Sequence, residues 1–315
     1  YGGLGLGAVE LALVQEQAGR RLLCAPYFSS VCLAANALRH CATAAAREKY
    51  LPLLAQGALR ATMPLGRADA AQAVRTTQGW KLESDALHVP DGADAQLLLV
   101  PARIDDQLTA LFALEPGTPG MSITPLQSWD ATRRFARVEL RGVALPQQAR
   151  IDEAPRAAVG WMSALALARL CIAAEALGGA QACLDLAVNY TGTRKQFGRA
   201  IASFQAVKHR CAEMRVKVEA LRSAVYGAAA LAASGAPVED MAQECAMAKA
   251  LSADTFFWCA QEAIQLHGGV GFTAEYDPQL YFKRAQASSH WLGDATALRE
   301  RIARRLFEAA PHPHS

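Results

Sequence analysis

The sequence predicts a mainly α-helical protein with a β-barrel domain in the middle of the chain. Residues 8–57 place apolar side chains three to four positions apart, as helices do, whereas residues 59–150 hold short β-type runs separated by Gly, Pro and Asp turns. From Ala157 onward the chain is rich in Ala, Leu, Met, Glu, Arg and Lys, which are strong helix formers. We therefore expect an N-terminal helical domain over 1–58, a β-barrel domain over 59–150 and a C-terminal four-helix bundle over 151–315.

The N-terminal helical domain begins after a glycine-rich opening. Tyr1 is followed by glycines at positions 2, 3, 5 and 7, a pattern typical of a loop inside a longer chain. We therefore expect that residues preceding Tyr1 are missing. Helical spacing then follows from Ala8, over 31–38 and over 50–54.

The middle domain contains four β-type runs, which we expect to form a small antiparallel sheet or barrel. These runs are Leu97 to Val100, Thr109 to Leu114, Met121 to Thr124 and Phe135 to Leu140. In the last run, apolar and charged residues alternate, which is typical of a strand with one solvated face. A polar linker from Pro146 to Pro155 ends the domain.

The C-terminal domain is expected to contain four helices, at roughly 157–191, 204–234, 238–266 and 291–309. Gly and Pro residues mark the breaks between them. Gly198 closes a basic segment, Ser234 to Pro237 forms a turn, and Gly268 to Gly271 interrupts a helix.

Composition excludes several classes of function. Lys and Arg number 32 against 29 Asp and Glu, and the positive charges are dispersed, so no nucleic-acid partner is expected. The eight cysteines form no Cys-x-x-Cys pair, which favours small buried side chains in a reducing cytoplasm and gives no sign of a metal site. The apolar run from Met162 to Leu186 is broken by charged residues, so we expect no membrane span.

The first candidate binding segment runs from Tyr190 to Gln205 and reads Tyr-Thr-Gly-Thr-Arg-Lys-Gln-Phe-Gly-Arg-Ala-Ile-Ala-Ser-Phe-Gln. A guanidinium beside a permissive Gly and a turn with free amides suits a phosphate. A solvated basic turn explains the same residues equally well.

The second candidate segment runs from Gln265 to Phe272 and reads Gln-Leu-His-Gly-Gly-Val-Gly-Phe. Its glycines let the backbone approach a ligand closely, and Gln265 could hydrogen-bond a ribose or an adenine edge. Taken alone, the segment could be only the end of a helix.

Together, these two segments resemble the acyl-CoA dehydrogenase family of flavoenzymes. The opening Tyr1 to Gly7 and the segment Lys49 to Leu54 also resemble the N-terminal helical domain of that family, so the resemblance covers essentially the whole chain. It implies a helical domain, a β-barrel and a four-helix bundle. It also implies FAD as the cofactor and a reaction in which a glutamate removes the α-proton of an acyl-CoA while a hydride leaves the β-carbon.

The resemblance assigns both segments to one half of an FAD site. In this family, a neighbouring subunit supplies them to the pyrophosphate and adenosine end of the cofactor. The cofactor-binding positions matched in this sequence are Arg194, Phe197, Gln205, Gln265, Leu266, His267, Gly268 and Gly269.

The residues that would face the flavin ring depart from the family. Where members carry Thr-Glu-Pro-x-Ala-Gly-Ser-Asp, residues 62–69 read Thr-Met-Pro-Leu-Gly-Arg-Ala-Asp, and where members carry Trp-Ile-Thr, residues 87–90 read Leu-His-Val-Pro. Neither segment keeps the polar contacts to the ring.

Both places where the family puts its catalytic glutamate also lack a carboxylate. Leu292 occupies the position within the family's Tyr-Glu-Gly-Thr segment, and Ala168 precedes Arg169 at the alternative position. Neither side chain can accept a proton, so no catalytic residue is assigned.

Four nearby groups could in principle substitute for the missing base. Glu175 lies among apolar residues, so we expect it to be paired with an Arg or the backbone. Asp294 lies two residues beyond Leu292, and His88 and His290 are more typical of structural or exposed histidines.

The pattern of kept and lost features favours a non-catalytic subunit. It resembles the base-lacking subunits of bacterial two-component acyl-CoA dehydrogenases that act on CoA thioesters of steroid side chains. We therefore expect an α2β2 cytoplasmic flavoprotein in which a glutamate-bearing partner subunit holds the acyl-CoA and an electron-transfer acceptor reoxidises the flavin. Two alternatives stay open: a homo-oligomeric flavoenzyme with a displaced base, and a flavin-free scaffold or acyl-CoA-binding protein.

Overall fold

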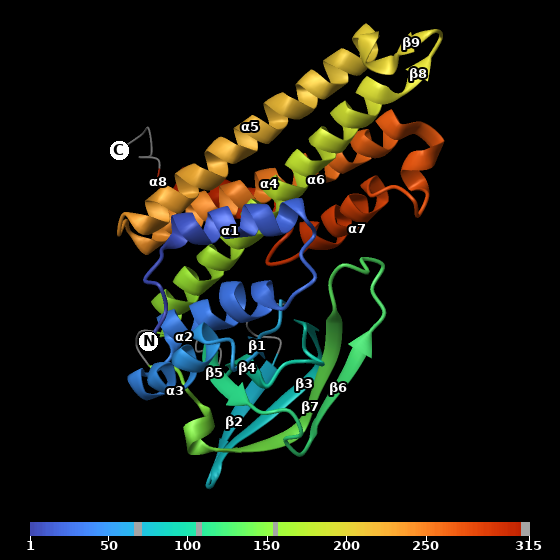
Figure 1. The fold of residues 1–315 in the computed structure, drawn as a ribbon. Helices are drawn as coiled ribbons and strands as arrows, with labels where there is room; N and C mark the ends of the chain where they lie inside the picture. The colour runs from blue at the N-terminus through green and yellow to red at the C-terminus, as the bar shows by residue number, and fades with distance from the viewer. Residues whose placement is uncertain (66–70, 105–108, 154–156, 310–315) are drawn as a thin grey trace. The chain divides into compact units, whose positions relative to one another are not determined.

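The computed structural model describes residues 1–65, 71–104, 109–153 and 157–309, and its chain forms two compact units (Figure 1). The first unit comprises the described residues of 1–6 and 24–168. The second comprises 7–23 and the described residues from Arg169 onward. Helix α4 is shared between them. The expected division into three domains at 58 and 150 stays a prediction.

The first unit opens with helical segments. They are the π-helix η1 (Phe28–Ala35), α2 (Asn36–Cys41) and α3 (Ala44–Ala55). Thr43 caps α3, because its Oγ1 accepts a hydrogen bond of 3.3 Å from the backbone N–H of Ala46. The helical segments expected at 31–38 and 50–54 are confirmed.

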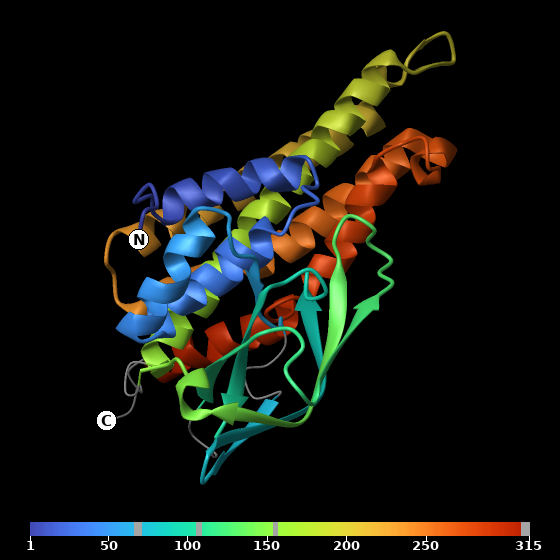
Figure 2. The same ribbon diagram turned by 60° about the horizontal axis from the view of Figure 1, so that its bottom comes forward.

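The first unit also contains a curled sheet of seven strands, drawn in cyan and green in Figure 2. The strands are β1 (Ala61–Thr62), β2 (Ala71–Thr76), β3 (Gly79–Pro90), β4 (Leu97–Arg103), β5 (Thr109–Leu114), β6 (Met121–Leu126) and β7 (Phe135–Pro146). Their order is β1-β4-β2-β3-β7-β6, and β5 pairs with β4. The side chains of Trp80 and Phe112 meet edge to face at 5.4 Å between ring centroids in its core.

The sheet corrects the sequence prediction in two respects. Strands β2 and β3 were not predicted, because β3 alternates outward polar residues such as Lys81 and Glu83 with buried ones and never forms a continuous apolar run. The sheet is also not purely antiparallel, since β4 pairs in parallel with both β1 and β2. The four predicted runs lie in β4, β5, β6 and β7.

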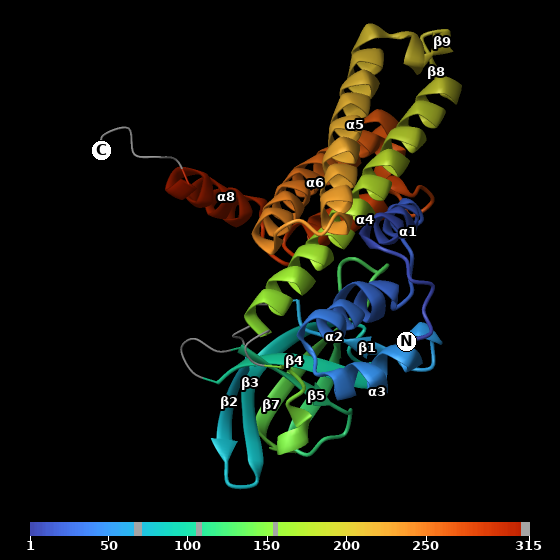
Figure 3. The same cartoon turned by 90° about the vertical axis from the view of Figure 1, so that its left-hand side faces the viewer.

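The second unit is a helical bundle. Its helices are α1 (Ala8–Arg20), α4 (Ala157–Thr193), α5 (Gln205–Ala233), α6 (Val238–His267), α7 (Pro278–Ser289) and α8 (Ala295–Ala309). Figure 3 shows α4 and α5 running side by side, with the short strands β8 (Lys195–Gln196) and β9 (Arg199–Ala200) joining their ends.

The first three predicted C-terminal helices are confirmed within two residues, but the last prediction was wrong in two ways. Helix α7, which begins at Pro278, was not predicted. The last helix begins at Ala295 rather than at 291, because Leu292 and Gly293 have φ angles of +56° and +108°, which no helix allows.

Helix α1 packs directly on α4 at two glycines. A Cβ atom on Gly19 would lie 1.9 Å from the carbonyl oxygen of Glu175, and one on Gly178 would lie 1.8 Å from that of Glu16. The two backbones therefore touch, which only glycine permits. An ion pair of 2.5 Å between Glu16 and Arg222 ties the same helix to α5.

Helix α4 also explains why the bundle is apolar. Its segment Ala158–Thr193 is long and apolar enough to cross a membrane, but 83% of the most apolar window is buried within the protein. The apolar composition of this segment is therefore that of a core helix. Six of the eight cysteines, all reduced, are likewise buried, as expected; Cys24 is exposed and Cys211 is half-buried.

Candidate functional site

The first candidate segment forms a tight hairpin at the end of α4 and α5 (Figure 1). Lys195 pairs with Ala200, and Gln196 pairs with Arg199. Phe197 and Gly198 occupy the turn with φ angles of +55° and +75°, which is the backbone of a two-residue hairpin with both central residues left-handed. The turn leaves the side chain of Phe197 91% exposed.

Arg194 lies where α4 meets this hairpin. Its backbone N–H donates to the carbonyl of Tyr190 at 2.8 Å, and its own carbonyl accepts from Ile201 at 2.9 Å. The side chain is exposed, and its guanidinium forms no ion pair with any residue that the structure describes. Gln205, also exposed, is the first residue of α5. These groups are free to bind a ligand.

The second candidate segment forms the end of α6 and the 3-10 turn η4 (Gly268–Phe272). Gly268 has a φ of +67°, and a Cβ on Gly268 or Gly269 would meet nothing within 4 Å. Gln265 is exposed and Leu266 is half-buried. The turn therefore presents open backbone and one amide side chain, a surface that suits close approach by a ligand.

An aromatic stack brings the two segments together. The rings of Tyr190 and His267 lie 4.3 Å apart between centroids with an interplanar angle of 22°. His267 is 5% exposed, and burial lowers the pKa of its imidazole, although its hydrogen bond with the carbonyl of Ala263 opposes this shift. Tyr190 was not among the predicted site residues. Its position at the start of the quoted segment was the only sequence signal.

Exposed cation, amide and backbone groups at one end of the bundle fit the pyrophosphate and adenosine part of FAD. Arg194 can form charge-assisted hydrogen bonds with phosphate oxygens, and the turn at Gly268 has room for a ligand against its backbone. The roles of the eight predicted residues stay predictions, but the structure places both segments on adjoining elements.

The Leu292 segment, defined as Ser289 to Asp294, contrasts with this arrangement. Leu292 is 8% exposed, and its carbonyl accepts a hydrogen bond of 2.9 Å from Nε of buried Arg169. Nζ of Lys249, which is fully buried, donates to the carbonyls of Ser289 at 2.5 Å and Gly293 at 2.7 Å. Two buried cations therefore hold the backbone where the family places its glutamate.

Desolvation changes the proton affinity of both cations. The pKa of Lys249 is lowered to about 8, mainly by burial and in part by the nearby positive charge of Arg169, and burial lowers the pKa of Arg169 to about 10. The carbonyl oxygens that they contact offset part of this cost. Neither cation can act as a carboxylate base.

The candidate substitutes for the base have other roles in the structure. Oε1 of Glu175 lies 2.6 Å from Nη1 of Arg284, and both side chains are almost fully buried, which confirms the expected partner. Asp294 caps α8 through a 2.9 Å hydrogen bond from the N–H of Ala297, and backbone hydrogen bonds lower the pKa of its carboxyl. His88 and His290 are exposed.

The two segments that would face the flavin ring bond to each other within the first unit. Oγ1 of Thr62 donates to the carbonyl of Pro90 at 2.6 Å, and the N–H of Leu65 donates to the carbonyl of His88 at 3.1 Å. Met63 and Leu65 are buried. Residues 66–69 lie outside the described residues. In the described part, the buried Met63 therefore stands where the family carries a glutamate, and the hydroxyl of Thr62 bonds within the unit.

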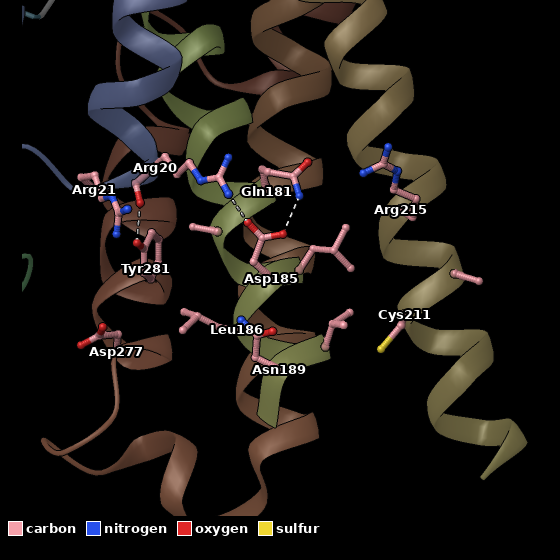
Figure 4. A pocket seen from close by; sticks show the side chains of 14 residues that line it. Arg20, Arg21, Gln181, Asp185, Leu186, Asn189, Cys211, Arg215, Asp277 and Tyr281 are labelled. Carbon is pink, nitrogen blue, oxygen red and sulfur yellow. Dashed lines mark hydrogen bonds and ion pairs between the residues drawn. The ribbon is translucent and has the colours of Figure 1, made fainter. Parts of the chain in front are cut away.

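A cavity of about 700 Å³ lies elsewhere in the helical bundle, between α1, α4, α5 and α7 (Figure 4). Asp185 on its floor accepts hydrogen bonds from Arg20 at 2.6 Å and from Gln181 at 2.9 Å. The hydroxyl of Tyr281 donates to the carbonyl of Arg20 at 2.7 Å. No sequence pattern predicts this cavity, because its lining comes from four separate helices. Among the described residues, no group of His, Cys, Asp and Glu side chains could hold a metal ion.

Comparison with known proteins supplies the family. Residues 160–307 match the acyl-CoA dehydrogenase C-terminal domain, and residues 1–58 match the N-terminal domain. The chain is 31% identical over 310 residues to the acyl-CoA dehydrogenase IpdE2 of Mycobacterium tuberculosis, which covers 98% of this chain and 81% of that relative. The chain belongs to the acyl-CoA dehydrogenase family. Members of this family bind FAD.

Two further similarities are informative within the acyl-CoA dehydrogenase family. IpdE2 of Mycolicibacterium smegmatis is 41% identical over 140 residues, which span 44% of this chain and 42% of that relative. The structure of the ChsE4-ChsE5 complex from Mycobacterium tuberculosis superposes with a TM-score of 0.88 at 31% identity, over 98% of this chain and 83% of that one. The predicted family and its mainly α fold with a curled β domain are confirmed.

Proposed function

We propose that this chain is a non-catalytic, FAD-holding subunit of a heteromeric acyl-CoA dehydrogenase. The observation that carries the proposal is the contrast between two parts of the helical bundle. Arg194, Gln205 and Gln265 are exposed and available to a ligand, whereas the Leu292 segment has no carboxylate at position 292, the family's base position, and is held in place by Lys249 and Arg169. A chain built this way can contribute to a cofactor site that another subunit completes.

In this proposal, the residues of this chain bind rather than react. Arg194 holds the pyrophosphate, while Gln205, Gln265, Leu266, His267 and the backbone at Gly268 and Gly269 surround the adenosine. Phe197 covers the same region from the hairpin turn. FAD, when bound, supplies the acceptor for the hydride that leaves the β-carbon of the acyl-CoA. A glutamate of the partner subunit accepts the α-proton, since Leu292 and Ala168 cannot.

The proposed assembly is an α2β2 heterotetramer in the cytoplasm that passes its electrons to a separate electron-transfer acceptor. Similarity to a structure that contains two different chains, the ChsE4-ChsE5 complex, supports a heteromer. The proposed substrate is a bulky acyl-CoA, with a steroid side chain as the class that the family resemblance favours. The acyl chain would lie in the pocket of the partner subunit.

The alternatives predict different behaviour. A homo-oligomer with a displaced base would need Glu175 or Asp294, but Glu175 is paired with Arg284 and Asp294 caps α8. A flavin-free scaffold would leave Arg194 without a ligand. The homo-oligomer would use the exposed groups of the two segments for its own FAD, so only the missing base argues against it, whereas the flavin-free scaffold leaves these groups unused.

The visible absorption spectrum and the light-scattering mass of the purified chain test the proposal. We expect the chain to hold no FAD alone, and to yield a yellow heterotetramer when it is co-expressed with a glutamate-bearing relative encoded beside it. A homo-oligomer that holds one FAD per subunit would overturn the proposal. Absence of flavin from every co-expressed complex would favour the scaffold instead.

A further inference from the structure

The stacked rings of Tyr190 and His267 join the end of α4, which leads into the hairpin, to the end of α6, which leads into the Gly268 turn. These two segments are far apart in the sequence, and a ligand with both a pyrophosphate and an adenosine must meet both at once. Tyr276 completes the cluster, because its ring lies edge-on to those of Tyr190 and His267, 6.0 Å from each. We call these three residues the aromatic cluster.

His267 transmits this contact to the glycine turn. Its Nδ1 lies 2.6 Å from the carbonyl of Ala263, which fixes the orientation of the ring. Gly268 follows immediately with its φ of +67°, and a Cβ on Gly271 would lie 3.0 Å from Cβ of His267. A Cβ on Gly271 would lie still closer, 2.7 Å, to the carbonyl oxygen of Ile264, so the turn packs closely on the last turn of α6, the same turn that carries the imidazole of His267.

Tyr190 transmits the contact to the hairpin on the other side. Its carbonyl accepts the hydrogen bond from the N–H of Arg194 at 2.8 Å, which closes the last turn of α4. The position of Tyr190 therefore fixes the backbone of Arg194, the first residue after α4. Tyr190 itself is half-buried.

We infer that Tyr190 is a positioning residue that aligns the hairpin with the glycine turn, so that ADP-containing ligands are bound by both segments together. This inference rests on the proposed function, since it assigns a role within the same half-site. The aromatic ring performs this role, because the stack with His267 requires a flat face and no hydrogen bond of the phenol is needed. A ligand that meets only the hairpin should not depend on Tyr190.

Two probes separate alignment from general stability. ADP should contact both segments, whereas inorganic pyrophosphate should contact only Arg194 and the hairpin. In calorimetric titrations of the co-expressed complex after removal of its flavin, we expect Tyr190→Leu to weaken ADP binding about two- to tenfold, the range expected for loss of one aromatic pair. Binding of pyrophosphate should not change, and Tyr190→Phe should bind ADP like the original chain.

The control variant is Phe257→Leu. Phe257 and Phe282 form another aromatic pair of the same bundle, with ring centroids 5.3 Å apart, and both are half-buried like Tyr190. Thermal unfolding should change similarly in Phe257→Leu and Tyr190→Leu, while ADP binding should weaken only in the latter. A Tyr190→Leu chain that does not fold would be replaced by Tyr190→Met, read by the same two titrations.

The outcomes are distinguishable. If Arg194→Ala abolishes ADP binding but Tyr190→Leu leaves it unchanged, or weakens ADP and pyrophosphate equally, the role of Tyr190 is overturned and the proposed function stands. If the flavin-free co-expressed complex binds no ADP, or if the complex with Arg194→Ala binds it equally well, the half-site itself is overturned and the inference falls with it.

Discussion

Two regions of the helical bundle treat their polar groups in opposite ways. At the hairpin and the glycine turn, Arg194 and Gln265 are exposed and bond to no other described side chain. In the Leu292 segment, the backbone carbonyls of Ser289, Leu292 and Gly293 accept hydrogen bonds from the buried side chains of Lys249 and Arg169. Polar groups that are left available indicate binding, whereas polar groups that are satisfied internally indicate structure. A chain that keeps the first and has leucine at the family's base position in the second is suited to holding a cofactor rather than to proton transfer.

The largest expected effect tests whether Glu175 has a structural role as the ion-pair partner of Arg284. Arg284→Met would leave the Glu175 carboxylate buried without its ion-pair partner, so the free energy of unfolding should fall by about 3–5 kcal/mol in chemical denaturation. Arg304→Met, which removes an exposed pair with Glu300, should change it by less than about 0.5 kcal/mol. Unchanged stability together with lost dehydrogenase activity would instead assign Glu175 to catalysis.

The next effect tests the binding region. In the co-expressed complex, Arg194→Ala should weaken FAD binding by about 1.5–3 kcal/mol, because the phosphate loses a charge-assisted hydrogen bond. Flavin released during gel filtration measures this loss. Lys208→Ala removes a nearby exposed charge from α5 and should retain the flavin. Full retention of FAD by Arg194→Ala would contradict the half-site.

These two regions were not equally predictable from the sequence. The hairpin residues and the glycine turn were singled out because together they resemble two motifs of the acyl-CoA dehydrogenase family, and their glycines also predict the local turns; their role in binding stays a prediction. Tyr190 could not be assigned, since its stack with His267 depends on how α4 packs against α6. The expected partner of Glu175 followed from its apolar neighbours, but the sequence could not identify Arg284.

The fold shows the same division between local and long-range information. Long helices such as α5 and α6 were predicted within two residues, because composition and turns determine them locally. Strand β3 was missed, since its alternation of buried and exposed residues makes sense only beside β2 and β7. The hydrogen bond of Lys249 with the Leu292 segment could not be predicted either, because Lys249 and Gly293 are 44 residues apart in the sequence.

The third effect is the pH dependence of stability that Lys249, the donor to two carbonyls of the Leu292 segment, should cause. Lys249 has a pKa of about 8 in the folded protein against 10.5 unfolded, so between these values the unfolded chain binds the extra proton. Lys249 should therefore add to stability as pH rises from 8 to 10.5, by up to about 1.4 kcal/mol per pH unit.

Lys249→Met provides the comparison for that measurement. It removes the titration and leaves two buried carbonyls without a donor, which should cost about 2 kcal/mol at pH 7. The difference in unfolding free energy between the original chain and the variant should grow as pH rises from 8 to 10.5. A difference that shrinks would show that Lys249 is more strongly protonated in the folded state.

The smallest effect concerns the cap of α8. Asp294→Ala should lower the free energy of unfolding by about 1 kcal/mol, whereas Asp294→Asn keeps an oxygen for the N–H of Ala297 and should change it by a few tenths. Activity of the complex should survive both changes. Loss of turnover in Asp294→Asn with normal stability would reveal Asp294 as the displaced base.

The contact between α1 and α4 has a consequence for how the protein folds during synthesis. Arg20 and its ion-pair partner Asp185 are 165 positions apart, so at about 5–20 residues per second the ribosome needs about 8–33 seconds to supply the residues that α1 packs against. The close backbone contact of α1 with α4 at Gly19 and Gly178 can form only then. Until then α1 lacks the surface on which it packs, and the polar side chains of its packing face, Gln15 and Glu16, are exposed to water.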